Sequence, residues 1–485
     1  MKSSNSTSPF LHRGLIEGFY GTPYRHVDRL WWIEELGRLG MNRYLYAPKD
    51  DPLHRDEWRT PYPDEKIEEF RELVEAGERC SVCVGFAISP GVSMVYGARD
   101  DREQLRKKID QFRSAGARLF CLALDDVPTQ LLHDADQHRY SSLAEAHIDL
   151  AHHLRGWIGE DAMLWLIPTD YVGTEPTPYL EQLGSELAPD IEVAWTGRTV
   201  LSPEIRAEEA RARADTLRRR LLIWDNVPVA DGPMRAALHL SPYLGRDPEL
   251  ASVASGILLN GMVQPRASAI AVRSAAEYLE DPSDYDPEAA WERAAAAASE
   301  GVEEPFALFA RAHRFGPTNS EDKDRELEEL WRAVEQVLEQ KRPERAALGA
   351  LARGVAARLA VADELRARLL DRDLLAEIEP WIVSHHEETR RLAAATELLG
   401  TLAANRAPMV CLRELFRFEA RLREPLPTEI SYGPRRLLYP QLVSLDDDTA
   451  RFGDDPVLFR DGMWIDGAVD FVEALAVERL RGERG

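Results

Sequence analysis

Cysteine, basic charge and long apolar runs are all scarce in this chain of 485 residues. Four cysteines are too few for a disulfide framework and indicate a reducing compartment. The 60 Lys and Arg residues against 84 Asp and Glu give a formal net charge of -24, which repels nucleic acid and anionic membrane surfaces. No run approaches the roughly 20 apolar residues of a membrane span, and the first ten residues lack the apolar stretch of a secretory signal. We therefore predict a cytoplasmic protein whose partner is neutral or cationic, not nucleic acid or membrane.

One pair of cysteines, Cys80 and Cys83, forms a CxxC motif. Such a motif can be a redox pair or half of a zinc site. No second CxxC and no matching histidine pair accompany it, and residues 81–88 are typical of a buried strand. A structural role is the prediction, and we expect neither a metal site nor an organic cofactor.

Short apolar runs alternate with amphipathic stretches from residue 14 to about 280, which is typical of repeated βα units. The predicted strands are 14–20, 43–48, 81–89, 118–124, 162–168, 191–197, 221–226 and 255–260. The intervening segments have apolar residues at helical spacing and open on Asp, Glu or Ser, which suits helix starts. This pattern predicts a (β/α)8 TIM barrel over residues 14–285. A doubly wound open sheet is the alternative, but no GxGxxG follows the first strand.

Beyond residue 286 the strand signal fades and Ala, Leu, Glu and Arg dominate. Residues 286–485 are therefore predicted to form an all-α helical bundle domain, with an irregular, Pro-, Gly- and Asp-rich segment near 425–465. An exposed apolar stripe used for dimerisation is the second interpretation of the helical spacing. Residues 1–13 are predicted to be a disordered tail.

Barrel enzymes place their chemistry at the carboxyl ends of the strands. In this chain those ends carry polar or aromatic residues: Gly18, Phe19 and Tyr20; Lys49 and Asp50; Ser89; Asp125 and Asp126; Thr169, Asp170 and Tyr171; Trp195 and Thr196; Trp224, Asp225 and Asn226; and Asn260. Although they are far apart in the sequence, a barrel would bring them to one mouth.

Two neighbouring aspartates, Asp125 and Asp126, directly follow an apolar run. Neighbouring carboxylates repel, so a fold keeps such a pair in water or gives it a task. The pair can serve one site only where the strand ends, and the following Val127-Pro128 favours that bend. If one carboxylate is less solvated, it can keep a proton as general acid while its neighbour stays ionised. That division suits a substrate whose own acetamido oxygen is the nucleophile; a solvated turn is the alternative.

Seven segments together resemble glycoside hydrolase family 84, the O-GlcNAcases and related β-N-acetylglucosaminidases once described as hyaluronidases. They are GLIEGFYGTPY (14–24), YLYAPKDDP (44–52), ALDDVP (123–128), PTDYVGT (168–174), AWTG (194–197), IWDNVPVAD (223–231) and GILLN (256–260), in the family's order. The resemblance implies a retaining exo-β-N-acetylglucosaminidase. Such an enzyme hydrolyses terminal β-linked GlcNAc by substrate assistance, through an oxazoline intermediate and without a cofactor.

The same resemblance implies roles for individual residues around the reacting bond. Asp125 would orient and polarise the 2-acetamido group, and Asp126 would be the general acid and then the base. Tyr171 would hydrogen-bond the forming oxazoline. Trp224 would wall the acetamido pocket, and Asn226 would contact the acetamido end or the glycosidic region.

Four further residues would hold the sugar. By resemblance, Asp231 and Asn260 would bind sugar hydroxyls, while Gly18, through its backbone, and Lys49 would complete the polar cradle. Each also has a structural interpretation: Lys49 as a surface charge, Asn260 as a loop cap and Gly18 as a site of tight strand packing.

The expected substrate is O-GlcNAc on Ser or Thr of a protein or peptide, with a small GlcNAc conjugate as the competing prediction. An endo-acting hyaluronidase is a second enzyme interpretation, and a non-catalytic GlcNAc-binding module is a third. The helical domain loosely resembles the stalk of longer family members, which predicts a homodimer through that domain.

Overall fold

The computed structural model describes residues 8–314, 326, 329–330, 332–333 and 345–403, together with four short strands between residues 437 and 459. These residues fall into two compact units. The first takes its described residues from Met1–Gly232, Pro242–Ala290 and Pro440–Asp455, and the second from Pro233–Ser241, Trp291–Tyr439 and Pro456–Gly485.

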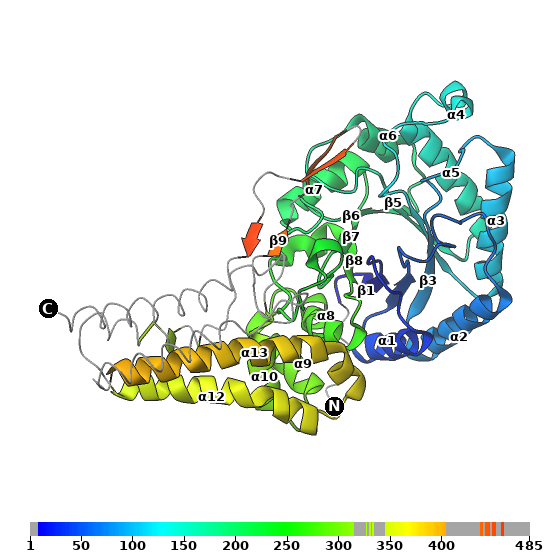
Figure 1. Cartoon of the computed structure of the whole chain (residues 1–485). Coiled ribbons are helices and arrows are strands. Elements are labelled where there is room, and N and C mark those ends of the chain that lie inside the picture. The colour runs from blue at the N-terminus through cyan, green and yellow to red at the C-terminus, as the bar shows by residue number, and fades with distance from the viewer. Residues whose placement is uncertain are drawn as a thin grey trace. The chain divides into compact units, whose positions relative to one another are not determined.

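The first unit contains a closed barrel of eight parallel strands (Figure 1). Its strands are β1 (His12–Glu17), β2 (Arg43–Tyr46), β3 (Cys83–Ile88), β4 (Leu119–Ala123), β5 (Met163–Ile167), β6 (Ile191–Trp195), β7 (Leu221–Asp225) and β8 (Ala254–Asn260). Each strand pairs with the next along the chain, and β8 pairs with β1 in the register Gly14↔Leu258. The prediction of a (β/α)8 barrel followed by a helical region is confirmed.

The first strand differs most from its predicted bounds. It begins inside the segment predicted to be a disordered tail, because His12 and Arg13 pair with Gly256 and Ile257 of β8. It ends at Glu17, since the N–H of Gly18 donates to the Asn260 side chain instead of a strand carbonyl. The chain therefore leaves the sheet at Gly18, at the carboxyl end of the barrel.

Helices surround the barrel (Figure 1). They are α1 (His26–Arg38), α2 (Asp64–Cys80), α3 (Arg99–Ser114), α4 (Asp134–Arg139), α5 (Leu143–Ile158), α6 (Pro178–Glu186), α7 (Ala207–Leu217) and α8 (Pro265–Glu280). Two of these helices begin with a side-chain cap: Ser142 accepts the N–H of Glu145 in α5, and Thr177 accepts the N–H of Leu180 in α6. Two short 3-10 helices, Gly232–Met234 and Pro248–Ser252, lie between β7 and β8.

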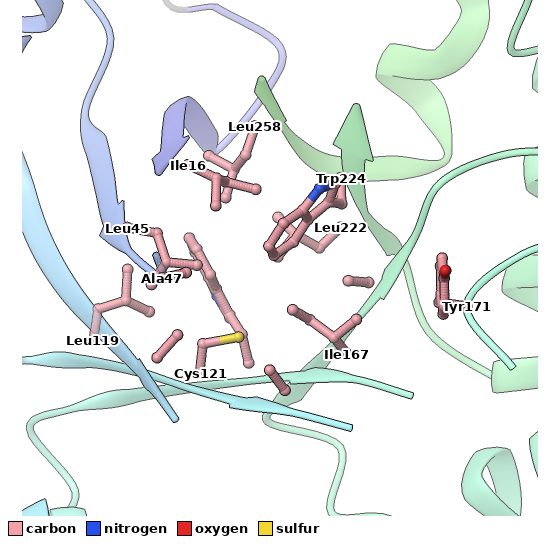
Figure 2. Packing of buried hydrophobic residues seen from close by; sticks show 14 residues of the cluster. Ile16, Leu45, Ala47, Leu119, Cys121, Ile167, Tyr171, Leu222, Trp224 and Leu258 are labelled. Carbon is pink, nitrogen blue, oxygen red and sulfur yellow. The ribbon is translucent and has the colours of Figure 1, made fainter. Parts of the chain in front are cut away.

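Apolar side chains fill the interior of the barrel. Figure 2 shows members of this cluster, and the labelled side chains include Trp224. Trp165 and Leu119 are fully buried there, so the barrel is a packed core and not a pore. Polar chemistry is thereby confined to the mouth, where the strands end.

The second unit is helical, with α10 (Glu303–Arg311), α12 (Arg345–Arg368) and α13 (Arg372–Ala403) wholly inside it and α9 (Pro287–Ala298) entering it at Trp291. It also includes residues 233–241, from the long connection after β7. The indole of Trp291 donates to the carbonyl of Leu240 at 2.6 Å, and that of Trp381 to the carbonyl of Ala236 at 3.0 Å. These bonds hold residues 233–241 to the helices of the same unit.

Four strands fall in the segment predicted to be irregular: β9 (Leu437–Tyr439), β10 (Leu442–Asp446), β11 (Thr449–Phe452) and β12 (Val457–Phe459). They form two antiparallel pairs, β10 with β11 and β9 with β12. The rest of that segment, and the predicted helical residues from 404 to 424, lie outside the described residues. Among the helices that are described, none is both long and apolar enough to cross a membrane.

Candidate active site

The predicted site residues all lie at the carboxyl end of the barrel. Gly18 follows β1, Lys49 follows β2, Asp125 and Asp126 follow β4, Tyr171 follows β5, Asn226 and Asp231 follow β7, Trp224 is the penultimate residue of β7, and Asn260 ends β8. Their contacts form two groups. We call Lys49, Asp125, Asp126 and Tyr20 the carboxylate network, and Gly18, Trp224, Asn226 and Asn260 the amide network.

In the carboxylate network, Asp125 is bound through one oxygen only. The Lys49 ammonium donates to its Oδ2. Its Oδ1 is buried and has no hydrogen-bond partner among the described residues. Although burial opposes the charge of Lys49, the two aspartates raise its pKa, so the ammonium stays protonated. Asp125 is thus a carboxylate held by a cation on one side and open on the other.

The neighbouring carboxylate, Asp126, is more exposed: 34% of its side chain is accessible, against 10% for Asp125. Its Oδ2 accepts the hydroxyl of Tyr20 at 2.6 Å and lies 3.5 Å from the Lys49 ammonium. Burial acts to raise the pKa of Asp126, but Lys49, the Tyr20 hydrogen bond and the Arg55 charge outweigh it and lower that pKa.

A less solvated carboxylate would be the better proton holder, and the resemblance gives the acid role to Asp126, but the structure has Asp125 as the less solvated of the two. Asp126 is the more solvated carboxylate and is ionised in the unliganded protein, because cations lie beside it.

The Tyr171 side chain is buried, and its backbone is fixed by the next strand. Its carbonyl accepts the N–H of Thr196. Two residues later, the N–H of Gly173 donates to the carbonyl of Gly197 at 3.0 Å. Burial raises the pKa of Tyr171 well above its usual value, and the charges of Asp126 and Asp125 add to that effect. Its hydroxyl therefore remains a hydrogen-bond donor.

The amide network forms a continuous wall. The N–H of Gly18 donates to Asn260 Oδ1 at 3.1 Å, and Asn260 Nδ2 donates to Asn226 Oδ1 at 3.0 Å. The same Asn226 oxygen accepts the indole N–H of Trp224 at 3.0 Å, and its Nδ2 donates to the carbonyl of Val200 at 2.7 Å. Each amide orientation is thus set by its neighbours, which fixes the Trp224 ring at the wall.

Gly18 has a packing reason to be glycine. A Cβ at this position would lie 2.4 Å from Cζ2 of Trp224 and 2.9 Å from Cγ2 of Ile16. Real side chains do not pack so closely, so a larger residue would displace the ring.

If Trp224 walls the acetamido pocket as the resemblance implies, replacing Gly18 with Ala is expected to lower kcat/KM by on the order of 10²-fold, because a shift of about 1 Å in a positioning group has that effect. Steady-state kinetics on an aryl glycoside of GlcNAc, the sugar that the resemblance implies, would measure it. Gly156→Ala is the matched control, since a Cβ there meets nothing within 4 Å. Wild-type kinetics in Gly18→Ala would show that the ring position is unimportant.

Asp231 lies in the loop after β7, and its Oδ2 accepts the N–H of Tyr20 at 2.8 Å. Burial raises the pKa of Asp231, while the Tyr20 N–H acts in the opposite direction. Tyr20 therefore connects Asp231, through its backbone, with Asp126, through its hydroxyl.

Two residues that contact Asp126, Tyr20 and Arg55, were not among the predicted site residues. Tyr20 was only one of many strand-end residues, and Arg55 belongs to a turn-rich segment after β2. The guanidinium of Arg55 donates to the Tyr20 hydroxyl at 2.7 Å and to the carbonyl of Asp126 at 3.1 Å. No periodicity marks Arg55, whose long side chain crosses from the β2 connection to the β4 connection.

Other strand-end residues support the site instead of facing it. Asp225 is buried and accepts bidentate donation from Arg246 and a hydroxyl from Tyr243. Asp50 accepts the N–H of Gly21, and Thr169 donates to the carbonyl of Leu124. A polar residue at a strand end is therefore not by itself a site residue.

No group of three or more His, Cys, Asp or Glu side chains suited to a metal ion occurs within the described part of the chain. Cys80, Cys83 and Cys121 are free thiols. Burial raises the pKa of Cys83 and of Cys121, which keeps both thiols protonated.

The closed barrel holds two adjacent carboxylates, a buried lysine and a wall of amide and aromatic groups at its mouth, an arrangement that suits a glycoside hydrolase. A family model described as beta-N-acetylglucosaminidase (NAGidase) matches residues 13–311. The chain belongs to this family, and the resemblance to glycoside hydrolase family 84 is confirmed.

Among known proteins, the Protein O-GlcNAcases of Rattus norvegicus and Mus musculus are each 34% identical over 271 residues. That match covers 55% of this chain but 29% of each relative, so the chain spans less than a third of their length. A solved mutant of the Thermobaculum terrenum O-GlcNAc hydrolase is 29% identical, with a TM-score of 0.85, and the match covers 98% of this chain and 97% of that one. CpGH84B shares the fold at 23% identity and a TM-score of 0.76, over 96% of this chain and 77% of that one.

Proposed function

We propose that the protein is a retaining exo-β-N-acetylglucosaminidase in which the acetamido oxygen of the substrate is the nucleophile. The observation that carries the proposal is the incomplete hydrogen bonding of the Asp125 carboxylate. Lys49 binds its Oδ2, while its buried Oδ1 has no partner among the described residues. A buried acceptor without a donor is costly, and the N–H of a 2-acetamido group would satisfy it.

In the first step, Asp125 accepts the acetamido N–H and turns the carbonyl oxygen toward C1. The bond from that oxygen to C1 forms as the glycosidic bond breaks, Asp126 delivers a proton to the leaving oxygen, and the acetamido N–H proton passes to Asp125, which leaves a neutral oxazoline. The Tyr171 hydroxyl hydrogen-bonds the forming oxazoline, while Trp224 closes one side of the acetamido pocket and Asn226 contacts its end.

Asp126 acquires its proton as substrate arrives. It is ionised in the free protein, and a neutral sugar that displaces water from it disfavours the charged form and raises its pKa. In the second step the Asp126 carboxylate removes a proton from water as that water attacks C1 and opens the oxazoline, and Asp125 returns its proton to the acetamido nitrogen. Two inversions at C1 give overall retention.

The sugar hydroxyls are bound around this centre. Asp231 accepts from a sugar hydroxyl, Asn260 accepts from or donates to another, and Gly18 and Lys49 complete the cradle. Asn260 already bonds Gly18 and Asn226, so it reaches the sugar from a fixed orientation.

The substrate we propose is O-GlcNAc on Ser or Thr of a protein or peptide. The names of the relatives, Protein O-GlcNAcase and O-GlcNAc hydrolase, support that class. A net charge of -24 favours neutral or cationic aglycones. The free thiols among the described cysteines support a reducing, cytoplasmic location.

The product configuration tests the proposal. Hydrolysis of 4-methylumbelliferyl β-GlcNAc by the wild type, followed by proton NMR, should release β-GlcNAc first. Inverted product, or a trapped glycosyl ester on the enzyme, would contradict it. Faster cleavage of hyaluronan than of the aryl glycoside would favour the endo-acting interpretation, and an inactive wild type would favour a binding module.

We also propose a homodimer formed through the helical unit, where Leu370, between α12 and α13, is an exposed apolar side chain. Light scattering at micromolar concentration should give twice the chain mass. A monomeric mass would contradict the dimer.

A further inference from the structure

Arg55 contacts the residue proposed as the acid in two ways. Its Nη2 donates to the backbone carbonyl of Asp126 at 3.1 Å, and its Nη1 lies 3.9 Å from the Asp126 carboxylate. Nη1 also donates to the hydroxyl of Tyr20 at 2.7 Å. Only 17% of the Arg55 side chain is accessible, so this cation is largely withdrawn from water.

Tyr20 transmits this contact to the carboxylate. A guanidinium can only donate, so the Tyr20 oxygen must accept from Arg55. The single proton of the hydroxyl is therefore free to point at Asp126 Oδ2, which is 2.6 Å away. The backbone N–H of Tyr20 donates in turn to Asp231. Arg55, Tyr20 and Asp126 thus form a chain of hydrogen bonds with one direction of donation.

We propose, building on the function above, that Arg55 is a positioning residue for the acid: through Tyr20 and the backbone of Asp126 it fixes the carboxylate at the mouth and keeps it ionised until substrate arrives. Arg55 does this without touching the reacting atoms. The ionised form is also the one that the second, base-catalysed step requires.

The charges around Asp126 fit this role. The groups that face it are two cations, two phenols and two carboxylates: Lys49, Arg55, Tyr20, Tyr171, Asp125 and Asp231. Burial raises the pKa of Asp126, and Lys49, the Tyr20 hydrogen bond and Arg55 together lower it by more. Burial and the Asp126 charge raise the pKa of Tyr20 to about 12, so its proton stays in place at working pH.

Loss of the Arg55 cation should shift the pH dependence of the enzyme to higher pH. The alkaline limb of kcat/KM reports loss of the acid's proton in the free enzyme. Removing the Arg55 cation destabilises the Asp126 carboxylate, raises its pKa, and moves that limb to higher pH. Since an opposite charge at this separation shifts a carboxyl pKa by roughly 1 unit or more, Arg55→Met should move the limb by about one pH unit.

Two further variants separate charge from position. Arg55→Lys keeps a cation but loses the planar fork that reaches both Tyr20 and the Asp126 carbonyl. It should leave the limb near its wild-type pH while lowering kcat roughly ten-fold on a substrate with a poor leaving group. Tyr20→Phe removes the hydrogen bond and should move the limb upward, as Arg55→Met does.

Arg59→Met is the matched control. Arg59 belongs to the same connection, but its guanidinium binds Asp101 and Ser93. Arg59→Met also removes one positive charge, but it should not move the alkaline limb of kcat/KM. Melting temperatures identify variants that fail to fold. An unchanged limb in folded Arg55→Met and Tyr20→Phe would overturn the proposal.

A titration without substrate keeps this test separate from the proposed function. Carbon-13 NMR of protein labelled at the aspartate carboxyl carbons follows Asp126 directly, with Asp126→Asn identifying its signal. The midpoint for Asp126 should rise in Arg55→Met whether or not the wild type hydrolyses GlcNAc. Equal midpoints in wild type and Arg55→Met would show that Arg55 does not hold the carboxylate, whereas a raised midpoint in an inactive enzyme would reject only the catalytic function.

Discussion

Replacing Asp126 with Asn is expected to lower turnover of a GlcNAc glycoside that has a poor leaving group by ~10²-fold or more, because the departing oxygen loses its proton donor. With an activated aryl leaving group, such as 4-methylumbelliferone, the loss should be much smaller. Azide should restore part of the rate by taking over from water in the second step. Steady-state kinetics on both substrates measure the difference.

Asp125→Asn should lower turnover by a similar factor, but for both leaving groups. In the proposed mechanism its carboxylate orients the acetamido arm, which is needed however easily the aglycone departs. Asp110→Asn is a suitable control, since Asp110 is exposed on α3 and lies 3.8 Å from the Arg106 guanidinium. Equal losses on the two substrates for Asp126→Asn would contradict its assignment as the acid.

The second large effect is expected on stability, from Asp225→Ala. Arg246 donates to both oxygens of Asp225, and the two side chains are only 1% and 2% accessible. Removing the carboxylate leaves a buried guanidinium without its counter-charge and the Tyr243 hydroxyl without its acceptor. Loss of one partner of such a pair costs roughly 3–5 kcal/mol. Thermal and denaturant unfolding should show it.

Two comparisons make this measurement specific. Asp190→Ala removes a surface partner of Arg155, 52% accessible, and should cost only about 0–1 kcal/mol. Replacing both Asp225 and Arg246 with apolar residues should recover much of the loss, because no unpaired charge remains. A loss below about 1 kcal/mol in Asp225→Ala would mean that Arg246 is satisfied by its backbone acceptors, the carbonyls of Pro203 and Leu244.

The barrel could be predicted because its signal is repeated eight times. Each apolar run followed by an amphipathic segment indicates one βα unit, and closure places the strand ends together. The chain order of polar strand ends then indicated the mouth. What local pattern could not give is the direction of individual side chains: Asp225 and Asn226 are neighbours, yet Asp225 is buried against Arg246 while Asn226 joins the amide network.

The solvation and charge environment of the two carboxylates could not be predicted from the sequence either. Which carboxylate is the more solvated depends on the position of Lys49, which contacts both Asp125 and Asp126 from another strand end. The contribution of Arg55 depends on a turn segment that carries no periodic signal. Long-range contacts of this kind are set by the folded chain, so they appear only in three dimensions.

The boundary between the units shows the same limit. A division near residue 286 follows from composition, whereas residues 233–241 group with the helices because indoles from α9 and α13 bind their carbonyls. Composition does not indicate that residues 233–241, which lie between β7 and β8, group with the helices.

Because residues 233–241 group with the helices, the unit that contains the barrel is not one contiguous stretch of polypeptide. A fragment ending near residue 285 would lose the donors for the Ala236 and Leu240 carbonyls, only a few residues beyond Asp231. Homologous recombination that swapped one half for that of a distant relative would have to keep this stretch compatible with the incoming helices.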